Sequence, residues 1–285
     1  MWPGYYEQLN GEQVMNSRVV KSVAGCALLL ASLVGHASSL MLEHAGNAGV
    51  RVSSGEHSVL IDVLFGPHTF FTSLSNSEFD AMHSRSAAVA MATHQHDDHF
   101  TPARALRYLQ RHPSTMMLGP PQVVEALNGQ VDAERLHTRV LTAYQSQRYE
   151  LNGVKVTMMH FPHMAPHADT VQNYAYLVEI NGWTVLHVGD GELTDDIITE
   201  LKLDEQRIDV ALIYDLLVSR QPHYASLLSK LNAGQVVFLH IPPDNISSFA
   251  GWLTANLPTA AMLSPQHKTL RYEAKSAEKT VKNHK

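Results

Sequence analysis

The segment His94-Gln95-His96-Asp97-Asp98-His99 places five side chains of metal-binding type within six positions. It follows the apolar run 87–93, which predicts a buried strand. Residues i and i+2 of an extended chain point to the same side, so the first two histidines can bind one ion together. The second aspartate and the last histidine follow as the chain turns toward a helix, so they can face a second ion. This mixture of nitrogen and carboxylate ligands suits zinc, and also iron or manganese.

The composition excludes several other classes of protein. Of the 285 residues, 45% are hydrophobic and 17% are charged, which excludes a disordered chain. A single cysteine excludes an intramolecular disulfide framework. The net charge of −6 argues against a protein that binds nucleic acid by broad phosphate neutralisation. The count of 18 histidines is high, and it makes their spacing worth following along the chain.

The N-terminal residues 1–38 have the pattern of a secretory signal peptide. Two basic residues, Arg18 and Lys21, precede the apolar run Val23–Val34, and small residues follow it. The run is shorter than the roughly 20 residues that a transmembrane helix needs. The residues before Met15 include no basic one, so Met15 is a better start for the signal. The pattern predicts export to the periplasm, with an uncleaved N-terminal anchor and lipidation of Cys26 as alternatives.

Apolar patterning divides the remainder into alternating strands and helices. The runs 174–180 and 183–188 flank Asn181-Gly182, a strong hairpin signal, and 49–52 with 58–64 predict a second hairpin. The hairpins make the expected fold class α/β with mixed sheets, in a domain spanning 40–272 followed by a disordered polar tail at 273–285. Further strands are expected at 87–93, 115–118, 154–159, 208–214 and 236–239, helices at 102–111, 122–127, 197–203 and 223–231, and long loops at 66–82 and 164–173.

The His-x-His-x-Asp-His pattern after a strand resembles the metallo-β-lactamase-fold hydrolase superfamily. The resemblance extends over about residues 40 to 270. It implies a four-layer αβ/βα sandwich with the site at the edge between two mixed sheets. It also implies two divalent metal ions, Zn²⁺ before Mn²⁺ or Fe, held by His94, His96, Asp98, His99 and three later ligand segments.

The first later segment offers three histidines for one ligand position. In the family, one histidine after this strand completes the first metal site. We prefer His163, because the ligand in related hydrolases often follows an apolar–proline pair such as Phe161-Pro162. His160 and His167 are the alternatives.

The other two segments each match one ligand of the family. Asp190, in Val188-Gly189-Asp190, matches the aspartate that bridges both metals. A cap on the following helix is its alternative role. His240 ends an apolar strand and matches the last ligand, on the second metal, and a buried core histidine is the alternative there.

Two such ions would lower the pKa of a bridging water from about 15.7 to near neutrality. The resulting hydroxide would attack a carbonyl or phosphorus, and the ion beside Asp98 would stabilise the developing charge. Asp98 and Asp190 therefore carry the catalytic centre. Outer carboxylates commonly hold a ligand histidine in one tautomer, a role open to Asp97 and also to Asp62 and Thr93. The candidates for substrate contact are Tyr214, Asp215 and His223.

The residue at position 190 bears on the reaction. Zinc β-lactamases carry cysteine or serine there, whereas an aspartate resembles the lactonases, thioester hydrolases and phosphodiesterases. The segments 171–173 and 183–190 resemble the branch near the ascorbate-phosphate lactonases. We expect an exported hydrolase of an ester-like bond in a small molecule, binding neither nucleic acid nor, after signal cleavage, a membrane. A β-lactamase, a non-catalytic periplasmic metal-binding protein and a di-iron redox enzyme are the alternatives. The sequence carries no signal for the oligomeric state.

Overall fold

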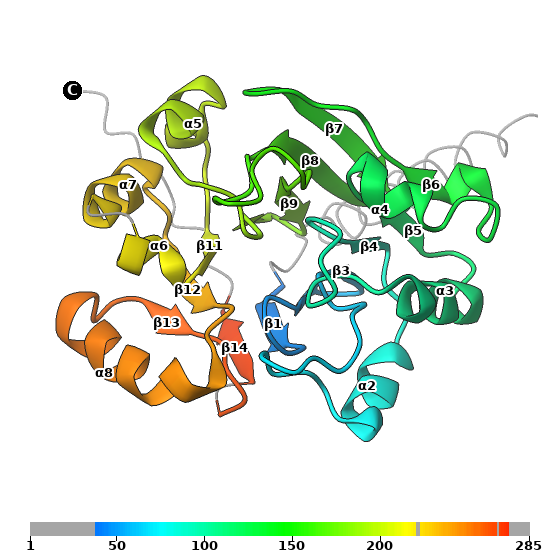
Figure 1. Ribbon diagram of the computed structural model, residues 1–285, viewed down its shortest axis with the longest axis horizontal. Coiled ribbons are helices and arrows are strands. Elements are labelled where there is room, and N and C mark those ends of the chain that lie inside the picture. The colour runs from blue at the N-terminus through cyan, green and yellow to red at the C-terminus, as the bar shows by residue number, and fades with distance from the viewer. Residues whose placement is uncertain (1–37, 221–222, 267, 274–285) are drawn as a thin grey trace, which may run out of the picture. The chain divides into compact units, whose positions relative to one another are not determined.

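The computed structural model describes residues 38–220, 223–266 and 268–273 (Figure 1). The predicted signal peptide and polar tail lie almost wholly outside these residues, so both stay predictions. Within the described part of the chain, no helix has the length and apolar character needed to cross a lipid bilayer.

The first of two sheets contains seven strands in the order β14-β1-β2-β3-β4-β5-β6. Strands β14 to β3 pair antiparallel and β3 to β6 pair parallel. The predicted hairpin is present, since β2 and β3 pair with Val52 opposite Val59. The strands are β1 Leu40–His44, β2 Val50–Ser54, β3 His57–Ile61, β4 Val89–Met91, β5 Met116–Leu118, β6 Leu136–His137 and β14 Thr269–Tyr272.

The second sheet repeats this arrangement with the order β13-β12-β11-β10-β9-β8-β7. Strands β7 to β10 pair antiparallel and β10 to β13 pair parallel. The β9–β10 turn is the predicted Asn181-Gly182, both with positive φ (45° and 83°), as a tight hairpin turn requires. The strands are β7 Ser146–Leu151, β8 Val154–His160, β9 Tyr174–Ile180, β10 Trp183–His187, β11 Val210–Tyr214, β12 Gln235–Leu239 and β13 Ala261–Met262.

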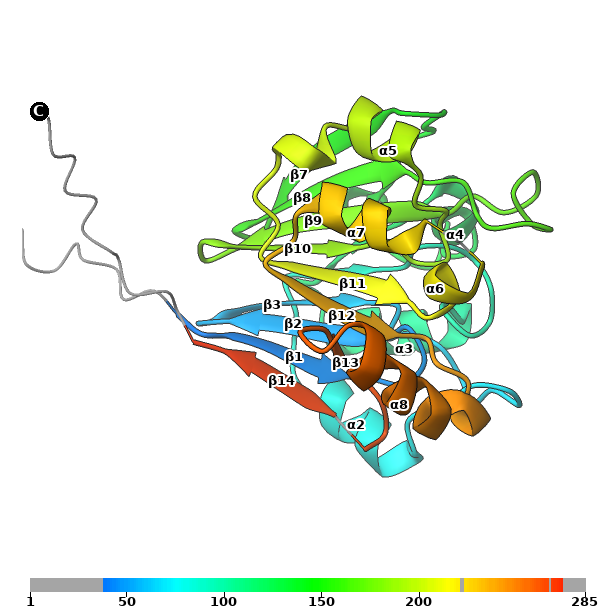
Figure 2. The same cartoon turned by 90° about the vertical axis from the view of Figure 1, so that its left-hand side faces the viewer.

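Alternation along the strands builds separate cores on the two faces of each sheet. Ile61 faces the core between the sheets, whereas its neighbour Leu60 faces the helices outside. In the same way, Val185 points inward and Leu186 outward in the second sheet. Helices therefore cover both outer faces and give the predicted four-layer αβ/βα sandwich, which is confirmed (Figures 1 and 2).

The helices divide between the two outer layers. The first sheet packs against α2 Asn76–His83, α3 Pro102–Arg111 and α4 Pro121–Glu125. The second packs against α5 Asp195–Glu200, α6 Leu216–Arg220, α7 Tyr224–Leu231 and α8 Ile246–Asn256. The short 3₁₀ turns are η2 Ala133–Arg135, η3 Leu203–Glu205 and η4 Pro243–Asn245.

The prediction of one long loop over residues 66–82 is wrong, because helix α2 occupies its second half. Ser75 accepts a hydrogen bond from the Glu78 amide, and the Glu78 side chain accepts one from the Ser75 amide. This reciprocal capping box starts the helix in a polar sequence. The true loop is therefore only the segment that follows β3 and ends at Ser75.

Candidate metal centre

The ends of strands from both sheets bring together all seven residues that we predicted as ligands. The segment 94–99 follows β4 of the first sheet, while His163, Asp190 and His240 follow β8, β10 and β12 of the second. Potential ligand atoms lie within 4.8 Å of one another in three groups. These are the first donor group (His94, His96, His163), the second donor group (Asp98, His99, His240) and a connecting group (His94, His99, Asp190).

The first donor group presents imidazole nitrogens from two sheets. Nε2 of His94 lies 3.0 Å from Nδ1 of His96. His163 donates from Nδ1 to the Met164 carbonyl, 2.9 Å away, because a carbonyl can only accept. Its Nε2 therefore carries a lone pair, is buried, and has no hydrogen-bond partner. This nitrogen is available to a metal ion.

The second donor group is arranged around Asp98. Its Oδ2 lies 3.3 Å from Nε2 of His240 and 3.5 Å from Nε2 of His99. Asn47 holds the group in place. Its side-chain amide donates to Asp98 Oδ2 at 2.9 Å, and its backbone carbonyl accepts from the backbone amide of His240 at 3.1 Å. His240 has a positive φ of 60°, a strained conformation of the kind that clusters at functional sites.

The carboxylate of Asp190 lies between the two donor groups. Its Oδ1 is 3.3 Å from Nε2 of His99 and 3.5 Å from Nε2 of His240, while its Oδ2 is 3.8 Å from Nε2 of His163. The two oxygens therefore face different groups, as a bridging carboxylate requires.

Gly189 allows the close approach of Asp190 to the centre. It has a φ of 58°, and a Cβ there would lie 2.6 Å from both Thr93 Cβ and Asn173 Oδ1. The same Asn173 oxygen accepts a hydrogen bond from the Asp190 amide at 3.2 Å. Only glycine fits between these neighbours.

Asp62, at the end of β3, is the outer carboxylate of the centre. Its Oδ2 accepts from Nδ1 of His99 at 2.8 Å and from the Thr93 hydroxyl at 2.7 Å. Its Oδ1 accepts from the Thr93 amide at 2.7 Å. A buried carboxylate on the far nitrogen of a ligand histidine fixes the tautomer and the direction of the ring.

The charges of the centre call for a cation. Burial opposes ionisation of Asp98, but His99 and His240 lower its pKa to about 2. Burial also opposes the charged form of His99 and His240, yet Asp190 raises the pKa of both rings, helped by Asp62 and Asp98 at His99 and by Asp98 at His240. Protons on these two histidines thus supply positive charge that a metal ion would replace.

The first donor group shows the opposite shift. Burial lowers the pKa of His94, His96 and His163, which keeps these rings neutral. Neutral imidazole is the form that binds metals.

Several buried polar atoms at the centre have no hydrogen-bond partner. Unpaired buried polar atoms are costly, so a group that satisfies several at one point is expected. The four atoms are Nε2 of His99, His163 and His240, and Oδ1 of Asp190. Nitrogen and oxygen atoms of this kind are suitable ligands for divalent metal ions.

The alternative histidines lie outside the donor groups. His160 ends β8, and its ring faces Tyr174 at 5.9 Å between centroids. His167 is exposed, with its ring 5.1 Å from that of His96 and 5.6 Å from that of His163. The structure therefore places His163 among the candidate ligands and His167 at the rim.

The remaining candidate residues do not join the groups either. The side chain of Asp97 is 85% exposed and lies 3.5 Å from His68, which is not a candidate ligand. The role of fixing a histidine tautomer therefore belongs to Asp62.

Of the three candidates for substrate contact, Tyr214 is buried and donates to Met164 Sδ at 2.7 Å, a position that does not suit substrate contact. Burial raises the pKa of Asp215 to about 6, against the influence of His240. His223 is exposed just before α7.

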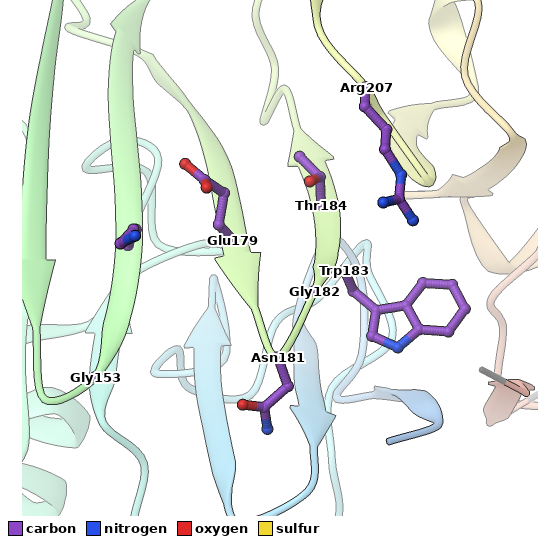
Figure 3. A pocket seen from close by; sticks show the side chains of 8 residues that line it. Gly153, Glu179, Asn181, Gly182, Trp183, Thr184 and Arg207 are labelled. Carbon is purple, nitrogen blue, oxygen red and sulfur yellow. The ribbon is translucent and has the colours of Figure 1, made fainter. Parts of the chain in front are cut away.

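A separate surface pocket lies at the start of β10, at the opposite end of that strand from Asp190 (Figure 3). Asn181, Gly182 and Trp183 of the β9–β10 hairpin line it, with Arg207 nearby. None of its lining residues belongs to the donor groups.

Comparison with known proteins agrees with the geometry. Residues 57–241 match the family model of the beta-lactamase superfamily domain, and this range includes all seven candidate ligands. No curated protein matches the chain.

Solved structures share the fold at low sequence identity. Igni18, a metallo hydrolase from Ignicoccus hospitalis, has 16% identity and a TM-score of 0.59, covering 83% of this chain and 100% of its own. YhfI from Bacillus subtilis, a metallo-beta-lactamase fold protein, has 12% identity and a TM-score of 0.56, with coverage of 83% and 100%. CmlA, a diiron β-hydroxylase from Streptomyces venezuelae, has 13% identity and a TM-score of 0.57, with coverage of 84% and 55%. These likenesses support the fold alone. The family model, which matches more than half of the chain, shows that the chain belongs to the beta-lactamase superfamily.

Proposed function

We propose that the protein is a metal-dependent hydrolase with a dinuclear centre, acting on an ester-like bond of a small molecule. The bond is that of a lactone, a thioester or a phosphoester. The observation that carries the proposal is the position of Asp190, whose two carboxylate oxygens face the two donor groups. A carboxylate between two nitrogen-rich groups suits a pair of cations better than a single one.

Each donor group would hold one cation, with Asp190 shared between them. Divalent cations there would supply an activated water as nucleophile and stabilise charge that develops on the substrate. Zinc is the first choice for these ligands, and manganese or iron also suits them. The chain itself supplies order: Asp62 keeps a proton on Nδ1 of His99, and Asn47 fixes the Asp98 carboxylate.

Asp190 also favours ester-like substrates over β-lactams, because zinc β-lactamases carry cysteine or serine at this position instead of aspartate. The finer relation to the ascorbate-phosphate lactonases stays part of the proposal. CmlA is described as a diiron β-hydroxylase, so redox chemistry is the second candidate for this ligand set.

The test combines metal content with turnover. The full chain, loaded with zinc, manganese or iron, is assayed by mass spectrometry and with a chromogenic cephalosporin, a lactone, a thioester and a bis-aryl phosphodiester. We expect about two metals per chain and hydrolysis of one ester class. Asp190→Asn should lower both readings, while the control Glu134→Gln, at an exposed side chain outside the donor groups, should change neither. Cephalosporin turnover would overturn the ester assignment, and loading without hydrolysis of any compound would favour metal binding or redox chemistry.

Export to the periplasm is also proposed, on the pattern of residues 1–38 alone. The test is expression of the full chain followed by N-terminal sequencing of the periplasmic fraction. We expect a mature chain that begins near Ala37. A full-length chain found only in the cytoplasm would contradict the proposal.

A further inference from the structure

A row of aromatic rings leads from the second donor group to the surface. The rings of Phe71 and His240 lie 4.6 Å apart between centroids, with an angle of 67° between their planes. His68 stacks on Phe71 at 5.1 Å with an angle of 29°, and lies 6.0 Å from Phe70. The last ring, Phe70, is 75% exposed, more than any other large apolar side chain in the described residues. A row of ring contacts therefore extends from a candidate metal ligand to an exposed phenylalanine.

The backbone holds this row in position. At the base of the segment, the Gly66 amide donates to the Thr101 hydroxyl at 3.0 Å. Farther along, the Thr72 carbonyl is packed so closely on Gly46 that a Cβ there would lie 2.6 Å from it. The segment is thus fixed at both ends.

His68 fixes the middle of the segment. Its Nδ1 accepts from the amides of Phe70 and Phe71 at 3.1 and 3.2 Å. Because amides only donate, the proton of a neutral His68 ring is on Nε2, which faces the Asp97 carboxylate at 3.5 Å. The two hydrogen bonds hold the aromatic segment together, and the 3.5 Å contact between His68 and Asp97 links it to the loop that carries the candidate ligands.

The charge around the row favours a neutral ligand group. The segment 66–74 contains no lysine or arginine, and the Asp97 carboxylate beside His68 is 85% exposed. A phosphate or carboxylate beside Phe70 would meet negative charge without a basic partner from this segment. Binding sites for small molecules typically combine such apolar walls with a few polar groups that fix orientation.

We propose that Phe70 and Phe71 form an apolar wall of the substrate site, and that the preferred substrate carries an aromatic or alkyl group beside the hydrolysed bond. The inference rests on the proposed function, since the metal centre would hold the reacting end. A wall fixed before binding costs little ordering entropy, so its contribution should be visible as affinity.

Binding of two phosphonates tests the wall independently of turnover. Phenylphosphonate and methylphosphonate carry the same anionic head and differ in the apolar group. Titration calorimetry on the zinc-loaded full chain should give at least about fivefold tighter binding of the phenyl compound. Phe70→Ala should reduce this ratio to below about twofold. The control Val140→Ala, at an apolar side chain that is 66% exposed, should leave the ratio unchanged.

Metal content is measured for every variant. Phe71→Ala should also reduce the phenyl preference, and if it loses metal because it contacts His240, the exposed Phe70 decides the question. Equal binding of both compounds by the unmodified chain, binding of neither, or a preference that survives Phe70→Ala would overturn the inference. Failure of the proposed function would look different: the phenyl preference would remain while no ester was hydrolysed.

Discussion

Oδ2 of Asp62 lies 2.8 Å from Nδ1 of His99, and this contact directs the other nitrogen of the ring into the centre. Nε2 of His99 consequently lies 3.3 Å from Asp190 and 3.5 Å from Asp98. Asp62 therefore influences the donor groups indirectly, by fixing the orientation of the His99 ring.

Asp62→Asn should weaken metal binding without removing a ligand. The amide keeps the shape of the side chain but loses the charge that orients His99, and loss of such partners typically costs about 10- to 100-fold in affinity. Competition with a chelator measures the effect. Thr93→Ser, which retains the hydroxyl that contacts Asp62 at 2.7 Å, is the matched control and should bind metal normally. Normal affinity in Asp62→Asn would contradict the role.

Three histidine variants should separate the candidate ligands after β8. His163→Ala should lower the metal content, because His163 is the one of these three histidines that belongs to the first donor group. His160→Ala and His167→Ala should keep the full content, since these rings lie outside the three groups of ligand atoms within the described chain. Mass spectrometry of the purified variants gives the answer. Metal loss in His160→Ala with full content in His163→Ala would reverse the assignment.

Gly189→Ala should destabilise the fold more than Gly182→Ala does. Both glycines have positive φ, so each substitution carries a backbone cost of about 1–2 kcal/mol. A Cβ at Gly182 meets nothing within 4 Å, whereas one at Gly189 meets Thr93 and Asn173 at 2.6 Å. Overpacking of this kind adds about 1–3 kcal/mol. Urea unfolding measures the difference, and equal destabilisation of the two variants would show that the neighbours give way.

His83 should make stability depend on pH. Burial lowers the pKa of this ring to about 3, from 6.5. Below pH 6.5 the unfolded chain therefore binds a proton that the native protein does not. The free energy of unfolding should fall as pH drops from about 6.5 toward 3, by at most about 1.4 kcal/mol per pH unit.

His83→Met removes this contribution. Urea unfolding of the metal-free protein at pH 7 and pH 5 should show a smaller drop in the variant, by up to about 2 kcal/mol. The exposed His223→Gln control should behave like the unmodified chain. An identical drop in His83→Met would show that the ring titrates normally.

The sequence was informative about the centre because most candidate ligands come directly after apolar strands. Helix α3 and the β9–β10 hairpin also lie where proline and Asn-Gly predicted them. The role of Asn47 could not be predicted, because it depends on the β1–β2 turn meeting the end of β12, more than 190 residues away. Strand β7 escaped prediction since its residues are mostly exposed or half-buried and few are apolar.

The candidate ligands are divided between the two sheets, which also meet directly where the Tyr176 hydroxyl of β9 donates to the Ala92 carbonyl after β4, at 2.7 Å. Ions bound between the sheets would stabilise their native alignment. By the same linkage, a change that disturbs this alignment would weaken metal binding. Substitutions deep in the inter-sheet core, far from any ligand, should therefore register as changes in metal affinity. The packing of the interior and the metal affinity of the candidate centre would therefore not be adjustable separately.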